Sequence, residues 1–495
     1  MRPVLLAVAC SMALTASAAW AAEPVAAEFP GAETIRANGL LKTVGYLASP
    51  SLAGRLAGSP GYMSAAREMA ARFRRMGLKP AGEQDGDFFQ RLTVEYNEIT
   101  SCRLALLPPD GAVRELKLGP DFVARGLTGT GVCTARVVFA GYGLSAPEKG
   151  YDDYAGLDAS GTVVLAFKEP PPFRMDSLGW GESTMPRPKG RTAAAHGALA
   201  LLLVSTPNQP HPQRPIGSML EGPGPQDLGL MRLQVDGHVA QAMVWTSGLD
   251  LGALQAAIDS TKQPHSQVLA VSARVATSAV YHAKQASVNV VARIEGSDPA
   301  LRDQCVVIGA HLDHVGSQGD IYFPGANDNA SGAAAVMAIA QAFARGGPRP
   351  KRSVIFALFS SEESGLDGSR RFVEHPPVPL ERIVAYLNLD CVGVGDSIQL
   401  GSGKTSPRLW QLARDLDERG ARLSVEETWG GGGADATPFA EKKIPTLYFA
   451  SRFSYPHLHL PSDTPDTLNP ALYEALTRLA YRTAWKVAEG GYSGE

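Results

Sequence analysis

Histidine and carboxylate side chains recur in the second half of the chain, and several of them lie at the ends of apolar runs. The set consists of His311, Asp328, Glu363, Asp390 and His459, with Glu362 directly before Glu363. Two histidines and three carboxylates are ligands that suit a pair of zinc ions. The additional glutamate would be left to act as a general base. This pattern indicates a metal-dependent hydrolase.

Single members of this set allow simpler readings. His311 could be an exposed turn residue, although Asp313 two positions later could orient a zinc-binding imidazole. Asp328 precedes a helical stretch and could be only a helix cap. Asp390 favours the ligand reading more strongly, because it ends an apolar run in which an unpaired carboxylate would be costly.

The apolar runs predict the elements that position these residues. Runs that are apolar on both faces alternate with stretches of helical periodicity, which indicates an α/β fold with a mostly parallel sheet and helices on both faces. The expected strands are 289–294, 305–309, 354–359, 385–389 and 446–449, and the expected helices are 35–47, 63–76, 331–344, 409–418 and 472–487. Ligands of such sheets bind at the carboxyl ends of the strands, where most of the candidates lie.

The segment 126–280 has a different texture. It contains none of the candidate ligands, and its proline-rich stretches 170–172 and 207–215 suit exposed loops. We therefore expect a smaller, β-rich α+β domain inserted between residues 23–125 and 281–495. Short strands are expected before it, at 88–94 and 103–107.

The first 22 residues resemble a secretory signal, with a charged start, an apolar run and an Ala-x-Ala ending. This predicts export to the periplasm or the extracellular space. Lipidation at Cys10 is a weaker alternative, because the apolar stretch before it is very short. No other apolar run is long enough to cross a bilayer, so stable membrane insertion is not expected. A net charge of -3 argues against a nucleic-acid partner held by bulk electrostatics.

The order of these motifs resembles the co-catalytic two-zinc aminopeptidases of metallopeptidase family 28. The matching positions are His311-x-Asp313, Asp328, Glu362-Glu363, Asp390 and His459-x-x-x-Asp463, together with Leu52-Ala53-Gly54-Arg55 and Gly58-Ser59-Pro60-Gly61 near the start. The inserted segment resembles a protease-associated domain, through Phe139-Ala140-Gly141-Tyr142-Gly143, Tyr151-Asp152-Asp153-Tyr154 and the stretch 193–204.

The resemblance implies a role for each matched residue. His311 and Asp390 would hold one zinc ion, Glu363 and His459 the other, and Asp328 would bridge the two. Glu362 would be the general base and Asp313 the orienting residue. His457 competes for the last position, but the family places an aspartate and a threonine four and five residues after the ligand, as Asp463-Thr464 do for His459. Peptides with a free N-terminus would be the substrates, their α-ammonium held by acidic residues.

The chain departs from the family pattern in two places. Leu458 stands where many members have a tyrosine that donates to the oxyanion, so Tyr455 or Tyr448 would have to substitute. Ala436 stands where a histidine is common, whereas Asp435 before it is kept. Asp435 and Tyr455 are therefore the candidates for substrate contact.

Two other functions are compatible with the sequence. A carboxypeptidase or dipeptidase would need basic residues around a terminal carboxylate, and Arg370, Arg371 and Arg452 are near the motifs in sequence. A receptor-like binding protein on the same fold would need neither ligands nor base. The sequence does not indicate the oligomeric state, the preferred N-terminal residue or whether Cys102 and Cys133 pair.

Overall fold

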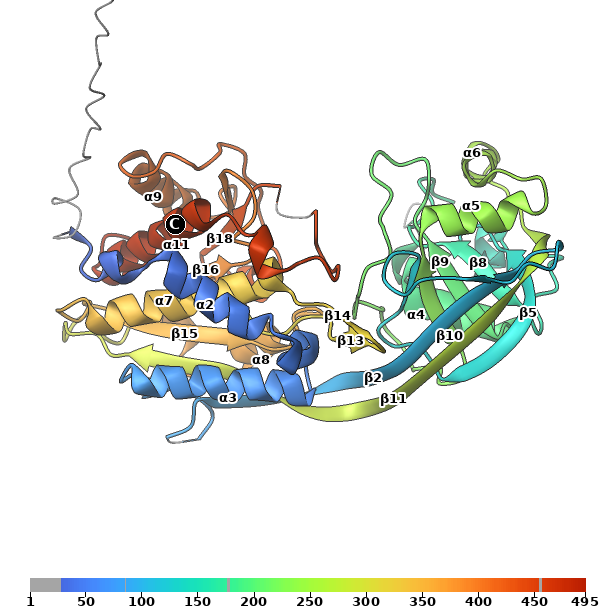
Figure 1. The fold of residues 1–495 in the computed structure, drawn as a ribbon. Helices are drawn as coiled ribbons and strands as arrows, with labels where there is room; N and C mark the ends of the chain where they lie inside the picture. Colours follow the sequence, from blue (N-terminus) through green and yellow to red (C-terminus); the bar gives the residue numbers. More distant parts are fainter. Residues whose placement is uncertain (1–27, 85, 176–178, 454–455) are drawn as a thin grey trace, which may run out of the picture.

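The computed structural model describes residues 28–84, 86–175, 179–453 and 456–495. The expected signal at 1–22, Cys10 and Tyr455 lie outside these residues. Two lobes are joined by two long antiparallel strands, β2 (Phe89–Leu107) and β11 (Gln267–Ile294), which run from one lobe into the other (Figure 1). We call the lobe that carries the candidate ligands the main lobe, and the described residues between β2 and β11 the inserted lobe.

The main lobe is built on a mixed sheet with the strand order β17-β18-β16-β12-β15-β11. The four central strands are parallel, whereas β17 and β11 pair antiparallel at the two ends of this series. The bounds are β12 Cys305–His311, β15 Ser353–Phe359, β16 Ile383–Leu389, β17 Ile398–Gly401 and β18 Thr446–Ser451. The mostly parallel α/β sheet expected from the apolar runs is confirmed.

Helices cover both faces of this sheet. One face packs against α2, α3, α7, α9 and α11, and the other against the short helices α8 and α10. Their bounds are α2 Ala37–Leu47, α3 Pro60–Arg75, α7 Gly332–Arg345, α8 Asp367–Glu374, α9 Pro407–Glu418, α10 Ala436–Glu441 and α11 Pro470–Ala488. The five helices predicted from periodicity are thus present, each shifted by at most a few residues.

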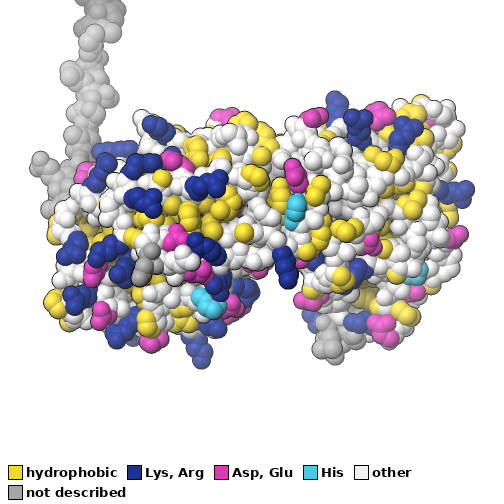
Figure 2. Space-filling model, turned by 90° about the horizontal axis from the view of Figure 1, so that it is seen from below, with side chains coloured by type: hydrophobic (Ala, Val, Ile, Leu, Met, Phe, Trp, Pro, Cys, Tyr) yellow, Lys and Arg dark blue, Asp and Glu magenta, His cyan; other side chains and the backbone are white. Residues whose placement is uncertain are grey.

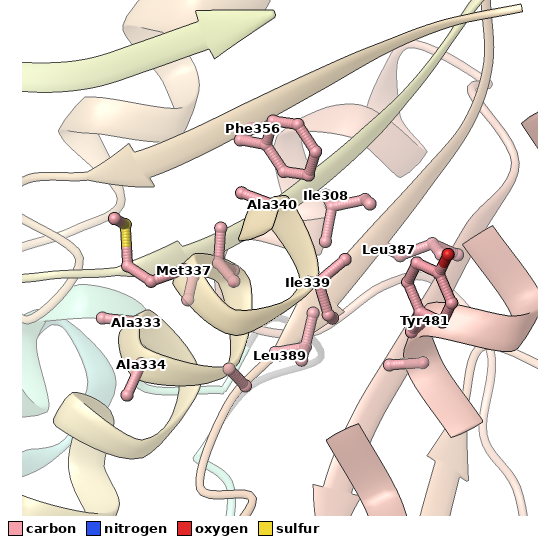
Figure 3. Packing of buried hydrophobic residues seen from close by; sticks show 14 of the residues in the cluster. Ile308, Ala333, Ala334, Met337, Ile339, Ala340, Phe356, Leu387, Leu389 and Tyr481 are labelled. Carbon is pink, nitrogen blue, oxygen red and sulfur yellow. The ribbon is translucent and has the colours of Figure 1, made fainter. Parts of the chain in front are cut away.

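Small residues bring α7 close to the sheet. Ala333, Ala334 and Ala340 lie on this buried helix, and Ile308 and Phe356 of the sheet belong to the same cluster (Figure 3). A Cβ on Gly332 would lie 2.2 Å from the carbonyl oxygen of Leu389, so only glycine fits where the helix starts. This close approach sets the segment before α7, which contains Asp328, beside the carboxyl end of β16.

The start of α3 shows how local sequence sets a boundary. Ser59 accepts a hydrogen bond from the backbone N–H of Tyr62 at 3.1 Å, and Pro60 occupies the first helical position. Three arginines in the last turn suit the negative end of the helix dipole.

The inserted lobe has its own core, and its strands continue the same sheet beyond β11. Its strands β5, β8, β9 and β10 are parallel to their neighbours, with β4 antiparallel beside β10 and β11 antiparallel beside β5. The bounds are β4 Phe122–Ala124, β5 Gly131–Phe139, β8 Val163–Phe167, β9 Ala200–Val204, β10 Met231–Val235, α4 Pro186–Ala195, α5 Gly237–Trp245 and α6 Leu251–Thr261. The limits 126 and 280 and the likeness to a protease-associated domain stay predictions.

Short elements complete the fold. They are β1 Lys79–Pro80, β3 Arg114–Glu115, β6 Ser145–Ala146, β7 Tyr151–Asp152, β13 Ser317–Gln318 and β14 Ile321–Tyr322. Basic and acidic side chains both occur on each lobe in the view of Figure 2, in keeping with a net charge of -3. None of the helices in the described ranges has the length and apolar character needed to span a membrane.

The residues expected as strands at 88–94 and 103–107 are extended, but the break expected between them is wrong. They are parts of the single strand β2, which pairs with β11 along its length through two irregularities in register. The polar residues between the two runs suggested a turn, but the cross-strand hydrogen bonds to β11 keep this stretch extended. Tertiary pairing therefore overrides the local pattern.

The question of a disulfide between Cys102 and Cys133 has a geometric answer. Cys102 pairs with Thr277 on one side of β11, and Cys133 pairs with Val275 on its other side. Two strand spacings separate them by about 10 Å, beyond the roughly 7 Å Cα separation that a disulfide allows. The cysteines within the described ranges are all free.

Candidate metal centre

The candidate ligands converge at one edge of the central sheet. His311 is the last residue of β12, Glu362 and Glu363 follow β15, and Asp390 directly follows β16. These three strands are parallel neighbours, so their carboxyl ends meet at the same edge. The placement predicted from the ends of the apolar runs is the one the structure has.

Asp328 lies between two histidines that come from distant parts of the chain. Its Oδ1 is 3.2 Å from His311 Nε2, and its Oδ2 is 2.9 Å from His459 Nε2. Each histidine faces a second carboxylate as well, with Asp390 Oδ1 at 3.4 Å from His311 Nε2 and Glu363 Oε2 at 3.0 Å from His459 Nε2. Asp328 is therefore shared by two groups of possible ligands, and His311, Glu362 and Glu363 form a third.

The donor set fits a pair of cations. One group comprises His311, Asp328 and Asp390 and another His314, Asp328, Glu363 and His459, with the ligand atoms of each group within 4.8 Å of one another. Asp390 Oδ1 is buried and has no hydrogen-bond partner in the part of the chain that the structure describes. Several buried carboxylates so close together repel one another unless cations offset the charge, and imidazole with carboxylate is a donor set that zinc accepts.

The electrostatics of Asp328 agree with a charged, bridging carboxylate. Burial alone would raise the pKa of Asp328, but hydrogen bonds to His311 and His459 outweigh it and hold the pKa well below its ordinary value. Burial likewise acts to raise the pKa of Glu363, yet the charge of His459 lowers it to about 2. Both carboxylates are therefore ionised at neutral pH.

His314 is a member of the site that the sequence reasoning missed. It is buried, and its Nδ1 lies 2.7 Å from Glu363 Oε1 and 3.9 Å from Asp328 Oδ2. Its ring packs edge-on against His459 with centroids 5.3 Å apart. The sequence offered one indication of this role, because His314 lies three residues after His311.

Asp463 and Arg55 hold the segment that carries Asp328. The carboxylate of Asp463 accepts hydrogen bonds from the backbone N–H groups of Asn327 at 2.9 Å and Asp328 at 3.1 Å. The fully buried guanidinium of Arg55 donates to the carbonyls of Leu312 at 3.0 Å, Pro324 at 2.7 Å and Gly325 at 3.0 Å. These contacts give a structural reason for the arginine and aspartate motifs quoted above.

Asp313 lies beneath the site but differs in detail from the expectation. Its carboxylate accepts from the backbone N–H groups of Glu362 at 3.2 Å and Glu363 at 3.4 Å. The Nδ1 of His311 lies 3.2 Å from the backbone carbonyl of Asp313 and 3.9 Å from its carboxylate. The carbonyl is thus the hydrogen-bonding partner of His311, whereas the carboxylate positions the two glutamates.

The two neighbouring histidines near the end of the chain differ in surroundings. His459 Nε2 points at Asp328 and Glu363, whereas half-buried His457 makes a hydrogen bond of 2.9 Å with the hydroxyl of Ser462. Of these two histidines, only His459 belongs to a group of possible ligands in the described part of the chain.

A cavity of about 820 Å³ opens over the ligands and is lined by both lobes. Glu362 lines it with a partly exposed side chain, and burial together with the charge of Glu363 raises its pKa well above its ordinary value, against the effect of His311. The inserted lobe contributes Arg125, Lys168 and Glu169 among others. Glu362 therefore lines the cavity together with Asp328, Glu363 and Asp390, and its side chain is partly exposed.

The remaining candidates have different positions. Leu458 lines the cavity and has no hydroxyl that could donate to an oxyanion. Tyr448, which was a candidate to replace that donor, donates its hydroxyl to Asp390 Oδ2 at 2.5 Å. Asp435 is fully buried, and burial raises its pKa to about 6. Tyr448 is thus engaged with a proposed ligand in this structure. A substrate contact for Asp435 stays a prediction.

Comparison with known proteins identifies the family of the region that carries the candidate ligands. A family model described as Peptidase family M28 matches residues 289–484, which include all of the candidate ligands. Residues 289–484 are a peptidase family M28 domain. This confirms the resemblance to metallopeptidase family 28 for the motifs from His311 to Asp463.

Relatives and solved structures extend the comparison. The chain is 33% identical over 159 residues to leupeptin-inactivating enzyme 1 of Streptomyces exfoliatus, covering 32% of this chain and 34% of that protein. It is 31% identical over 192 residues to a probable glutamate carboxypeptidase LAMP1 of Arabidopsis thaliana, covering 34% of this chain and 27% of that protein. The chain thus spans about a third of the length of these relatives.

Two solved structures share the fold over nearly the whole chain. An aminopeptidase from Aneurinibacillus sp. strain AM-1 aligns with a TM-score of 0.63 at 20% identity, covering 93% of this chain and 96% of that one. A zinc aminopeptidase from Bacillus subtilis aligns with a TM-score of 0.60 at 18% identity, covering 93% and 97%. The M28 domain and the inserted lobe together therefore have the fold of these proteins.

Proposed function

We propose that the protein is an exported aminopeptidase that uses two zinc ions to remove N-terminal residues from peptides. The observation that carries the proposal is the position of Asp328, whose two oxygens face histidines of two separate ligand groups at 3.2 and 2.9 Å. The M28 domain and the fold shared with a zinc aminopeptidase support zinc as the metal. Export is supported by the signal-like sequence of the first 22 residues.

The proposal assigns residues to each ion. His311 and Asp390 would hold one, Glu363 and His459 the other, and Asp328 would bridge them, with His314 supporting Glu363. Bound zinc would polarise the scissile carbonyl and lower the pKa of a water molecule at the site. Glu362 would accept the proton of the attacking water and return it to the leaving amine.

The residues around the cavity favour an aminopeptidase over a carboxypeptidase. Of the three arginines that the carboxypeptidase reading would use, only Arg370 lines the cavity, and it pairs with Glu441 at 3.0 Å. Arg371 contacts Glu83, and Arg452 pairs with Glu427 at 3.0 Å. Glu169 is an acidic group in the cavity that could hold an α-ammonium.

A carboxypeptidase remains the second candidate. It is favoured by Lys168 and Arg370, which both line the cavity, and by the relative described as a probable glutamate carboxypeptidase. A terminal carboxylate would then be held where the first proposal places the terminal amine.

A substrate panel separates the two candidates. We expect hydrolysis of aminoacyl 4-nitroanilides with a free amine, and loss of nearly all turnover when the same compounds are N-acetylated. Peptides with a blocked N-terminus and a free carboxylate serve as the matched control. Cleavage of these blocked peptides with no cleavage of the free anilides would make the protein a carboxypeptidase.

A further inference from the structure

We infer that the inserted lobe positions the metal-binding imidazole of His459 through the backbone carbonyl of Gly217. The inserted lobe would then help to form the metal centre, in addition to lining the cavity above it. This inference rests on the proposed zinc centre. It concerns one ion of the pair, the one assigned to Glu363 and His459.

The contact between the two residues is reciprocal. His459 Nδ1 lies 2.9 Å from the carbonyl oxygen of Gly217, and the N–H of Gly217 donates to the carbonyl of His459 at 3.0 Å. A zinc-binding imidazole usually gives its second N–H to a carbonyl or carboxylate, which fixes both the tautomer and the direction of the ring. With Nδ1–H donated to Gly217, Nε2 is the free acceptor that faces Asp328 and Glu363.

His459 needs such support, because its own backbone is unusual. Its φ of 55° lies in the left-handed region, which costs energy for a residue other than glycine. Two hydrogen bonds to Gly217 hold both the ring and the backbone of His459. They are made to a segment about 240 residues earlier in the chain.

That segment is anchored firmly within the inserted lobe. We call residues 215–221 the strap. The side chain of Arg125 donates to the hydroxyl of Ser218 and the carbonyl of Leu220, both at 3.1 Å, and to Glu221 Oε1 at 2.9 Å. Glu221 also binds Arg232 at 3.0 Å, and the Arg125, Glu221 and Arg232 side chains are at most 3% exposed. The buried ion triad therefore fixes the strap to the sheet of the inserted lobe.

The strap also packs closely against the main lobe. A Cβ on Gly217 would lie 2.6 Å from Val315 Cγ2 and 3.1 Å from the ring of Phe323. Nearby, Gln318 of β13 exchanges two hydrogen bonds with the backbone of Ala124 in β4, at 2.8 and 2.7 Å. Any larger residue at 217 must move the strap or its neighbours. Where the strap moves, the Gly217 carbonyl leaves its place beside His459.

The two zinc-binding histidines are supported differently. His311 Nδ1 lies 3.2 Å from the Asp313 carbonyl, which belongs to the same turn of the main lobe, whereas His459 relies on the inserted lobe. Moving the strap should therefore weaken one zinc site and spare the other. A general loss of stability would not produce this asymmetry.

The test measures the two zinc affinities of Gly217→Ala by competition with a chromophoric chelator, in protein shown to be folded by circular dichroism. We expect one affinity to fall by about 10- to 100-fold, the usual effect of losing an outer partner of a metal ligand, and the other to stay at the parent value. Adding Val315→Ala removes the methyl group at 2.6 Å and should restore most of the lost affinity.

Ile258→Ala provides the control, because it removes a buried side chain of α6 in the core of the inserted lobe and is not part of the strap. It should lower the melting temperature and leave both zinc affinities unchanged. Unchanged affinities in folded Gly217→Ala, or equal loss of zinc in Ile258→Ala, would overturn the inference. A parent protein that binds no zinc would overturn the proposed function and the inference with it.

Discussion

Glu362→Gln is expected to lower kcat by at least about 10²–10⁴-fold, the usual effect of losing a general base, while zinc content stays at the parent level. Glutamine keeps the shape of the side chain but cannot accept a proton at neutral pH. Glu362 lines the cavity, and its backbone N–H is held by Asp313 at 3.2 Å, so the position of the side chain should be kept. Steady-state kinetics together with metal analysis of the same sample measure both quantities.

The neighbouring substitution Glu363→Gln is the matched comparison. Glu363 Oε2 is 3.0 Å from His459 Nε2, so this change weakens a proposed ligand rather than a base. Its activity should be partly restored by excess zinc, as that of Glu362→Gln should not. Zinc loss in Glu362→Gln together with a zinc-replete, inactive Glu363→Gln would reverse the two roles.

His459→Ala is expected to remove bound zinc and nearly all activity. The imidazole Nε2 lies between Asp328 Oδ2 at 2.9 Å and Glu363 Oε2 at 3.0 Å, so its removal takes a nitrogen donor from a group of carboxylates. Without that donor, the remaining carboxylates bind the ion with fewer ligands than zinc prefers. Metal content after dialysis and anilide hydrolysis measure the effect.

His457→Ala controls for a general disturbance of the same loop. His457 is hydrogen-bonded to Ser462 and belongs to none of the ligand groups in the described residues, so its removal should leave zinc content near the parent value. If His457→Ala lost zinc while His459→Ala kept it, the assignment of the last ligand would be wrong by two residues.

The sequence was sufficient to predict the edge of the sheet where the ligands meet. His311, Glu363 and Asp390 follow runs that are apolar on both faces, and such runs form parallel strands whose carboxyl ends lie together. The order of the motifs then supplied Asp328 and His459, which lie on loops that no periodicity could place. The resemblance to a family carried this step, and the geometry agrees with it.

Other parts of the site required the three-dimensional structure. The role of His314 depends on Glu363, 49 residues later, and that of Gly217 depends on His459, 242 residues later. A backbone carbonyl leaves no trace in the side-chain pattern, so nothing in the sequence around Gly217 pointed to the metal centre. The single strand β2 was missed for a related reason, because its polar middle is kept extended by β11.

The central claim is that Asp328 joins two zinc sites, and the most direct test is the amount of zinc that each folded chain binds. Equilibrium dialysis of chelator-treated protein against buffered zinc, followed by metal analysis, should return two ions per chain, with hydrolysis of anilides lost on chelation and regained as zinc is restored. A single tightly bound ion that supports full activity would contradict the account.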